Sequence, residues 1–165
     1  MVPRNTLGRA NPPSGIWKGG SLNAAGLIVL LLDDSVFIRR VLGDLLEKQE
    51  NVQQVLRARN ATEGILMFES RRPDVVILDL ELPDDHGLKV LKSIKKARPS
   101  CVVLVFSSLS LRDECLAAGA DCFMSKDQSV ARVPQMLNAL CDAKGLRTPN
   151  LDGAPKPATS SRDLT

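Results

Sequence analysis

The sequence predicts an α/β fold: a doubly wound parallel sheet of five strands with helices on both faces. Between residues 25 and 144, short apolar runs alternate five times with longer segments whose apolar residues recur every three or four positions. Alternating strand and helix signals of this kind are typical of parallel sheets with right-handed helical crossovers. The apolar runs are also nearly unbroken, as expected of strands that are buried on both faces.

The first strand is predicted over residues 27–33, where an unbroken apolar run leads into the acidic pair Asp33-Asp34. We expect Ser35 to cap the next helix, because a serine hydroxyl accepts a hydrogen bond from a free N–H group of the first turn. That helix carries apolar residues at the spacing of one buried face: Ile38, Val41, Leu42, Leu45 and Leu46.

The second strand is predicted over residues 52–58, which are more polar than the other strand segments. A more polar strand is expected nearer the edge of the sheet, where one side is less buried. The second helix is predicted to begin at Asn60 or Thr62, since both residue types cap helices. It ends before Pro73, because a proline disfavours helical backbone in the residue before it.

The third strand, residues 75–79, is a buried apolar run that closes with Asp79. A loop bounded by Pro83 and Gly87 precedes a helix striped by Leu88, Leu91 and Ile94. The remaining predicted elements are a buried strand at 102–106, a short helix at 111–118 closed by Gly119, a short strand at 122–124 and a helix whose apolar stripe runs from Val130 to Leu140.

The natural arrangement for five such units is the flavodoxin-like strand order 2-1-3-4-5. In this order strands 1 and 3 are neighbours, which places Asp33 and Asp34 beside Asp79. Ligand sites of open parallel sheets form just outside the carboxyl ends of the strands. We expect residues 25–144 to form this domain, with flexible tails at 1–24 and 145–165, where proline, glycine, serine and threonine are frequent.

Composition excludes several classes of function. The chain has 165 residues, of which 44% are apolar and 25% are charged, and it carries a net charge of +3. The excess positive charge lies in the terminal segments 1–18 and 146–165, so it gives little support for a DNA-binding surface on the domain. The apolar segment 24–32 is too short to span a bilayer, and no signal cleavage site follows it. We therefore expect a cytoplasmic protein without membrane contact.

The four cysteines do not suggest a metal site. They are Cys101, Cys115, Cys122 and Cys141, and no two of them have the C-x₂₋₄-C spacing of zinc ligands. We expect all four to be small core or near-core residues in a reducing compartment.

The acidic residues at two strand ends predict a metal site instead. Carboxylates that converge cannot all stay ionised without a nearby cation. Hard oxygen ligands of this kind suit Mg²⁺, and a Mg²⁺ site next to a phosphoryl group is the obvious chemical use of Asp33, Asp34 and Asp79.

Several residues in order carry a resemblance to a known family. Asp33-Asp34 ends the first strand, and Asp79 is followed by Leu-Glu-Leu-Pro-Asp-Asp-His-Gly, so that a glycine stands eight positions on. Ser107 ends the fourth strand, and Lys126 follows the fifth. Over residues 25–144 the chain resembles a response-regulator receiver domain of the stand-alone, chemotaxis-regulator type.

The resemblance implies that Asp79 accepts a phosphoryl group and becomes an aspartyl phosphate, as a carboxylate nucleophile can. It implies that Asp34 holds Mg²⁺ directly and that Asp33 does so directly or through water. Asp79 and the backbone carbonyl of Glu81 are the further implied ligands, so coordination does not restrict the side chain of Glu81.

The resemblance also assigns the groups that meet the phosphoryl oxygens. Lys126 neutralises one oxygen, the hydroxyl of Ser107 donates to another, and the backbone N–H of Ser108 is a further donor. Ser107 and Phe123 are the implied switch residues. In the family, the phosphoryl group draws the hydroxyl residue inward and the aromatic rotates into the space, which reshapes the face of helix 4, strand 5 and helix 5.

Two residues near the site are not expected to act in it, and two others depart from the family pattern. We interpret His86 as an ordinary loop residue and Gly87 as a requirement of loop geometry and of the start of the next helix. Asp127 follows Lys126 where many receivers have a cis-proline, so a cis bond is not expected. Ser107 replaces the commoner threonine, which keeps the hydroxyl but loses a methyl group.

The leading prediction is a single-domain regulator that receives its phosphoryl group from a sensor histidine kinase or a histidine phosphotransfer protein. It then binds a downstream protein that the sequence does not identify, and a phosphorylation-dependent dimer is one option. No turnover of an external substrate is expected. The alternatives are a phosphate sink or relay, and a Mg²⁺-dependent phosphatase with an aspartyl intermediate, since Asp79-Leu80-Glu81 resembles the D-x-D motif of haloacid-dehalogenase-type enzymes.

Overall fold

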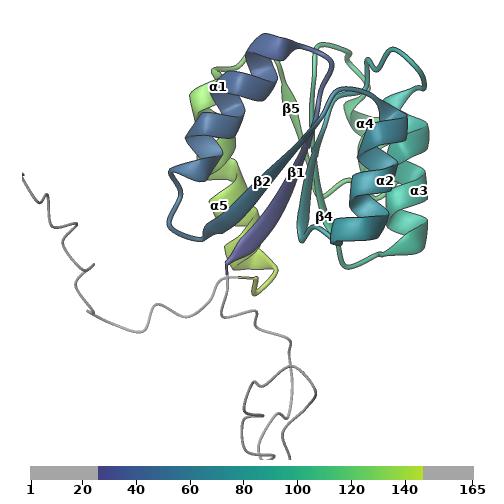
Figure 1. Cartoon of the computed structure of the whole chain (residues 1–165). Coiled ribbons are helices and arrows are strands. Elements are labelled where there is room, and N and C mark those ends of the chain that lie inside the picture. The colour runs from purple at the N-terminus through teal and green to yellow at the C-terminus, as the bar shows by residue number, and fades with distance from the viewer. Residues whose placement is uncertain (1–25, 147–165) are drawn as a thin grey trace, which may run out of the picture.

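The computed structural model describes residues 26–146, which form a parallel sheet of strand order β2-β1-β3-β4-β5 with helices on both faces (Figure 1). The strands are β1 (Leu27–Leu32), β2 (Val52–Ala58), β3 (Val75–Leu78), β4 (Val102–Ser107) and β5 (Cys122–Ser125). The helices are α1 (Val36–Glu47), α2 (Ala61–Arg71), α3 (Gly87–Ala97), α4 (Arg112–Ala117) and α5 (Val133–Ala143), with a 3₁₀ turn η1 (Val130–Arg132) before α5. The predicted fold class and strand order are confirmed.

The predicted tails lie outside the described residues, apart from Gly145 and Leu146. No helix within residues 26–146 is long and apolar enough to cross a membrane.

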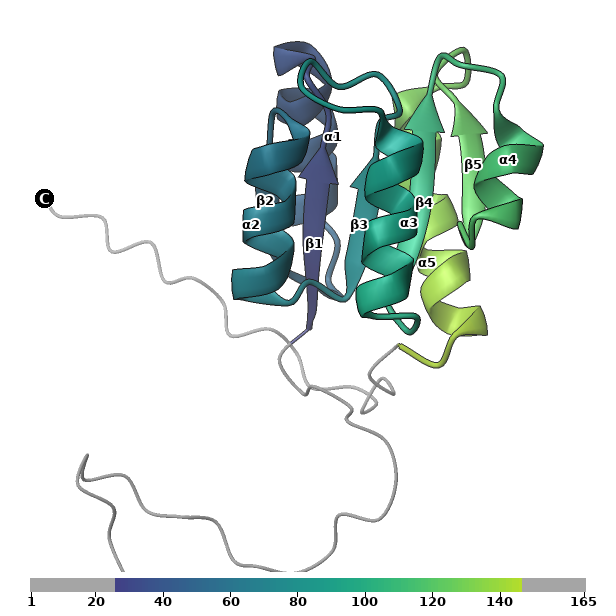
Figure 2. The same ribbon diagram turned by 90° about the vertical axis from the view of Figure 1, so that its right-hand side faces the viewer.

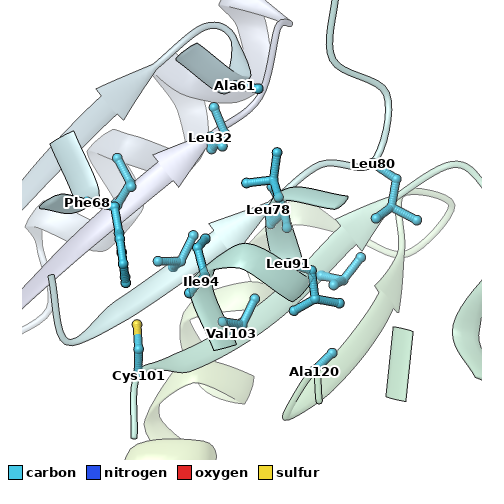
Figure 3. Packing of buried hydrophobic residues seen from close by; sticks show 14 of the residues in the cluster. Leu32, Ala61, Phe68, Leu78, Leu80, Leu91, Ile94, Cys101, Val103 and Ala120 are labelled. Carbon is cyan, nitrogen blue, oxygen red and sulfur yellow. The ribbon is translucent and has the colours of Figure 1, made fainter. Parts of the chain in front are cut away.

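The sheet separates two apolar cores. Side chains alternate between the two faces of a strand, so Leu30 and Leu32 of β1 pack with α2 and α3, whereas Val29 and Leu31 pack with α1 and α5. Figure 1 shows these two helical layers on opposite sides of the sheet. Figure 3 shows part of the core on the α2 and α3 side, with Leu32 from β1, Phe68 from α2 and Ile94 from α3.

Strand register brings the acidic residues to one level. Strands β1 and β3 pair in parallel, and Leu32 pairs with Leu78 at the end of both. Asp33 and Asp79 each follow by one residue, so they leave the sheet side by side. Strand β2, the more polar one, lies at an edge as predicted. In Figure 2 the strand arrows point to the edge that carries the acidic residues.

The predicted helix caps are confirmed for α1 and resolved for α2. The Ser35 hydroxyl accepts a hydrogen bond from Ile38 N at 3.3 Å. Asn60, rather than Thr62, caps α2, because its side-chain oxygen accepts from Glu63 N at 2.8 Å. Helix α2 ends through Arg72, which has a left-handed backbone with φ of 49°.

The last predicted helix is divided in the structure. Its first apolar residue, Val130, lies in the η1 turn, which is capped by the Ser129 hydroxyl. The α-helix begins at Val133 and has Pro134 in its first turn. A proline fits there, since the first N–H groups of a helix have no partner within it.

The cysteines lie where the sequence predicts. Cys101, Cys115 and Cys141 are buried, Cys122 is half-buried, and none of the four is in a disulfide bond. Burial raises the pKa of Cys101 to about 11, so this thiol stays protonated and unreactive at neutral pH.

Candidate functional site

Three carboxylates converge at the carboxyl ends of β1 and β3. One oxygen from each of Asp33, Asp34 and Asp79 lies within 4.8 Å of the others. Asp33 and Asp79 are almost fully buried, whereas Asp34 is exposed. The prediction that the two strand ends bring these acids together is confirmed.

Lys126 supplies the positive charge of the site. It follows β5, and its ammonium lies 2.8 Å from Asp33 Oδ2 and 2.5 Å from Asp79 Oδ2. Burial alone lowers the pKa of Lys126, but hydrogen bonds to Asp33 and Asp79 outweigh it, so the pKa is raised. The lysine is therefore charged at neutral pH. Its backbone N–H donates to Ser107 O at 3.0 Å, which ties the ends of β4 and β5 together.

The cluster has more carboxylates than positively charged groups. Burial raises the pKa of Asp33, and the nearby charge of Asp79 adds to that effect, while Lys126 and the Ser35 N–H oppose it. Three carboxylates share one ammonium in a partly buried site, so an additional cation would favour their ionised forms. Within residues 26–146, the Asp34 carboxylate has no hydrogen bond or ion pair, and it faces solvent. An exposed hard oxygen beside two buried ones fits Mg²⁺.

The Asp79 carboxylate is held at both oxygens. Oδ2 accepts from Lys126, and Oδ1 accepts from Glu81 N at 3.2 Å. The Asp79 backbone N–H donates to Leu32 O at 2.8 Å. The side chain of Glu81 is exposed, and its backbone forms an isolated antiparallel bridge with His86 that closes the loop between β3 and α3. Coordination of a metal by the Glu81 carbonyl stays a prediction.

Gly87 is required by close packing rather than by an unusual backbone angle. It is the first residue of α3, as predicted for a glycine that starts the helix. A Cβ atom there would lie 2.5 Å from Leu80 Cα and closer still to Asp79 O. His86 is more than a loop residue: it caps α3, because its Nδ1 accepts from Leu88 N at 3.2 Å.

Ser107 and Phe123 lie on the two strands beyond β3. Ser107 ends β4, is fully buried, and its hydroxyl accepts from Leu109 N at 3.3 Å. Ser108 is exposed. Phe123 is half-buried, pairs with Val105 across β4 and β5, and packs against the core on the α2 and α3 side. The switch roles of Ser107 and Phe123 stay predictions.

The loop after Lys126 has its own local support. The Asp127 N–H donates to Ser125 Oγ at 3.2 Å, and that hydroxyl donates to Asp127 Oδ2 at 3.0 Å. Within the described part of the chain no peptide bond is cis, in agreement with the expectation for the Lys126–Asp127 bond.

Sequence reasoning missed two residues that support the site. Arg39 Nη1 donates to the backbone carbonyls of both Asp33 and Asp34, each at 2.7 Å. A signal existed: a cation in the first turn of a helix is opposed by the helix dipole, so an arginine there indicates a specific partner.

Asp84 is the second residue that was missed. From the loop after β3 its carboxylate accepts hydrogen bonds from Ala61 N at 2.7 Å and from Thr62 N and Oγ1 at 2.9 and 2.7 Å. These bonds, the Thr62 hydroxyl first, lower the pKa of Asp84 to about 2. No local sequence pattern predicts this contact, because it joins residues more than twenty positions apart.

Comparisons with known proteins agree with this geometry. The family model described as response regulator receiver domain matches residues 29–138. The chain is 32% identical over 117 residues to a protein-glutamate methylesterase/protein-glutamine glutaminase of Clostridium acetobutylicum, covering 68% of this chain and 34% of the relative. A relative with the same name from Caldanaerobacter subterraneus is 39% identical over 103 residues, covering 59% of this chain and 28% of the relative. The chain thus spans about a third of the length of these relatives.

Solved structures show the same domain. The response regulator domain of Thermotoga maritima CheB is 29% identical, with a TM-score of 0.65 over 74% of this chain and 99% of that one. A CheY-like receiver domain protein from Methanospirillum hungatei has a TM-score of 0.68 at 23% identity, over 73% of this chain and 97% of that one, which shows the shared fold. The matched residues, the strand order and the acidic pocket agree, and the chain belongs to the response regulator receiver domain family.

Proposed function

We propose that this receiver domain accepts a phosphoryl group on Asp79 from a phosphohistidine of a sensor histidine kinase or a histidine phosphotransfer protein. One observation carries the proposal: oxygens of Asp33, Asp34 and Asp79 lie within 4.8 Å of one another, and the Lys126 ammonium contacts two of these carboxylates. This combines a nucleophile, a set of metal ligands and a cation for the transferred group in one place.

The transfer exchanges one bond to phosphorus for another. An oxygen of the Asp79 carboxylate attacks phosphorus, and the bond from phosphorus to the donor imidazole nitrogen breaks. The imidazole leaves with the electron pair of that bond and takes up a proton from water. Phosphoryl transfer of this type depends mostly on positioning and on neutralisation of the oxygens, so the protein must hold Asp79 still and supply positive charge.

The residues of the site divide these tasks. Asp33, Asp34, Asp79 and the carbonyl of Glu81 would hold Mg²⁺, which supplies positive charge beside the phosphoryl oxygens. The Glu81 N–H fixes one oxygen of Asp79. Lys126 already contacts the other oxygen, so a phosphoryl group on Asp79 would arrive within reach of its ammonium.

A conformational change is part of the proposal. Ser107 ends β4 beside the site, and its backbone carbonyl accepts from Lys126 N. If the Ser107 hydroxyl turns to donate to the phosphoryl group, it gives up its bond from Leu109 N. Phe123 on β5 is half-buried, and it would rotate toward the space that the Ser107 hydroxyl leaves. The result would be a changed surface over α4, β5 and α5 for a protein partner.

We propose no turnover of an external substrate for this domain. The similarity to the methylesterases extends over about a third of their length, and the receiver family model matches that part of this chain. Each chain would take one phosphoryl group and lose it by hydrolysis or by transfer to a histidine.

The test is phosphorylation of the full chain by acetyl phosphate with Mg²⁺, followed by intact-mass spectrometry. We expect one phosphoryl group on the wild type and none on Asp79→Asn. Asp85→Asn is the matched control, because Asp85 lies in the same loop and pairs with Lys89; this variant should label normally. Labelling of Asp79→Asn at the wild-type level would refute the proposal, and continuous hydrolysis of a small phosphate ester would indicate a phosphatase instead.

A further inference from the structure

We infer that Arg39 is a positioning residue of the metal site, which fixes the backbone of Asp33 and Asp34 so that both carboxylates face the ion. The inference deepens the proposed function and rests on it. The hydrogen bonds of Arg39 to the acidic pair go to backbone carbonyls and not to the carboxylates that would hold the ion.

The contacts of Arg39 are specific. A single nitrogen, Nη1, donates to Asp33 O and to Asp34 O, each at 2.7 Å. Arg39 stands in the first turn of α1, and helical side chains point back toward the helix N-terminus. Its guanidinium therefore reaches Asp33 and Asp34, the two residues before the N-cap Ser35. Hydrogen bonds from a charged donor are stronger and more directional than neutral ones.

Asp33 and Asp34 depend on Arg39 to different degrees. Asp33 has other supports: its N–H donates to Ala58 O at 3.2 Å, Oδ1 accepts from the Ser35 N–H at 2.8 Å, and Oδ2 lies 2.8 Å from Lys126. For Asp34, the bond from Arg39 to its carbonyl is the contact that the described part of the chain provides. The residue expected to bind Mg²⁺ directly is thus oriented through its backbone by Arg39.

Arg39 is itself held in place by β2. The backbone carbonyl of Arg39 accepts from Arg57 Nε at 3.2 Å, and the Arg57 guanidinium also pairs with Glu47 at 2.7 Å. Gly43 leaves room for this guanidinium against α1, since a Cβ atom there would come within 2.5 Å of Arg57 Nη2. The first turn of α1 is therefore anchored to the sheet, and Arg39 transmits that position to the acidic pair.

The direction in which Mg²⁺ affinity changes on removal of Arg39 distinguishes a positioning role from an effect of its charge. The positive charge of Arg39 opposes a cation in the neighbouring pocket, so loss of the charge alone would tighten Mg²⁺ binding. Loss of positioning would weaken it. Arg40 is the matched control, because it is the next residue of the same helix, is exposed, and within residues 26–146 makes no hydrogen bond or ion pair.

The experiment measures Mg²⁺ binding to the full chain by isothermal titration calorimetry. We expect Arg39→Ala to raise the Mg²⁺ dissociation constant about tenfold, the lower end of the range for groups that orient metal ligands. Arg40→Ala should leave the constant unchanged or lower it slightly. Labelling by acetyl phosphate should fall in Arg39→Ala at low Mg²⁺ and recover at saturating Mg²⁺, because Asp79 and Lys126 are untouched.

The pair Arg39→Gln and Arg40→Gln gives the same comparison if Arg39→Ala does not fold, since glutamine keeps one donor group but not the reach to both carbonyls. Equal Mg²⁺ affinity in the Arg39 and Arg40 variants, or tighter binding in the Arg39 variants, would overturn the inference. A wild type that binds no Mg²⁺ and takes no phosphoryl group would instead refute the proposed function, so the two failures are distinguishable.

Discussion

Gly87→Ala tests whether the backbone of the phosphoryl acceptor is packed as tightly as the structure indicates. Gly87 is the first residue of α3 and is buried against the segment that follows β3. The added Cβ atom would lie 2.5 Å from Leu80 Cα and closer still to Asp79 O. Both are backbone atoms, so no side chain can rotate away, and the loop or the helix must move.

The expected magnitude follows from two opposed effects. Alanine is a better helix former than glycine by about 0.8–1.0 kcal/mol in a helix interior, which favours the variant. Overpacking of a rigid site costs about 1–3 kcal/mol. Since backbone atoms meet the new methyl group, we expect the upper part of that range and a net loss of about 1–2 kcal/mol.

Urea unfolding followed by circular dichroism measures this loss. With a slope of about 2 kcal/mol per molar, the midpoint should fall by about 0.5–1 M. Labelling of Asp79 by acetyl phosphate should also slow, because the Asp79 carbonyl must shift. A Gly87→Ala variant as stable as the wild type and labelled at the wild-type rate would refute the reasoning.

Three other predictions concern charge and core packing. Lys126→Gln leaves the buried carboxylates of Asp33 and Asp79 without their cation, so the free energy of unfolding measured without Mg²⁺ should fall by about 3–5 kcal/mol. Thermal melts should show that Mg²⁺ stabilises this variant more than the wild type. An equal effect of Mg²⁺ on both proteins would contradict the ion-pair assignment. Asp84 has a pKa lowered to about 2, so its stabilisation is complete above the unfolded value near 3.8 and is lost as pH falls toward 2. The stability difference between wild type and Asp84→Asn in urea should therefore be smaller at pH 3 than at pH 6, and a difference that grows on acidification would be inconsistent with the assigned hydrogen bonds. Leu104→Ala empties a fully buried position of β4 and should cost about 2–5 kcal/mol, whereas a wild-type unfolding midpoint would show that the position is not close-packed.

Much of the fold follows from patterns that act over short distances along the chain. The unbroken apolar runs identified the buried strands, and the polar segment 52–58 was correctly placed at an edge. Ser35 was predicted as a cap because its hydrogen bond spans only three residues. The meeting of Asp33 with Asp79 was also predictable, since a parallel sheet of this order leaves little choice of register.

The supports of the site were not predictable in the same way. The contact of Asp84 with Thr62 depends on how the loop after β3 lies against the first turn of α2. No local sequence pattern encodes that arrangement. The two hydrogen bonds from Arg39 to the carbonyls of Asp33 and Asp34 depend on how the backbone is oriented before α1. The spacing of apolar residues also started the final helix too early, at Val130, because the η1 turn precedes α5, which begins at Val133. Long-range hydrogen bonds are set by tertiary geometry, and the sequence carries only weak signals for them.

The location of the phosphoryl group distinguishes Asp79 from the other two carboxylates of the site. The chain is labelled with acetyl phosphate and Mg²⁺, the acyl phosphate is reduced with borohydride, and peptides are mapped by mass spectrometry. We expect one modified residue, Asp79, and no modification when Mg²⁺ is chelated. Modification of Asp33 or Asp34 instead, or labelling of Asp79 that is unaffected by chelation, would contradict this expectation.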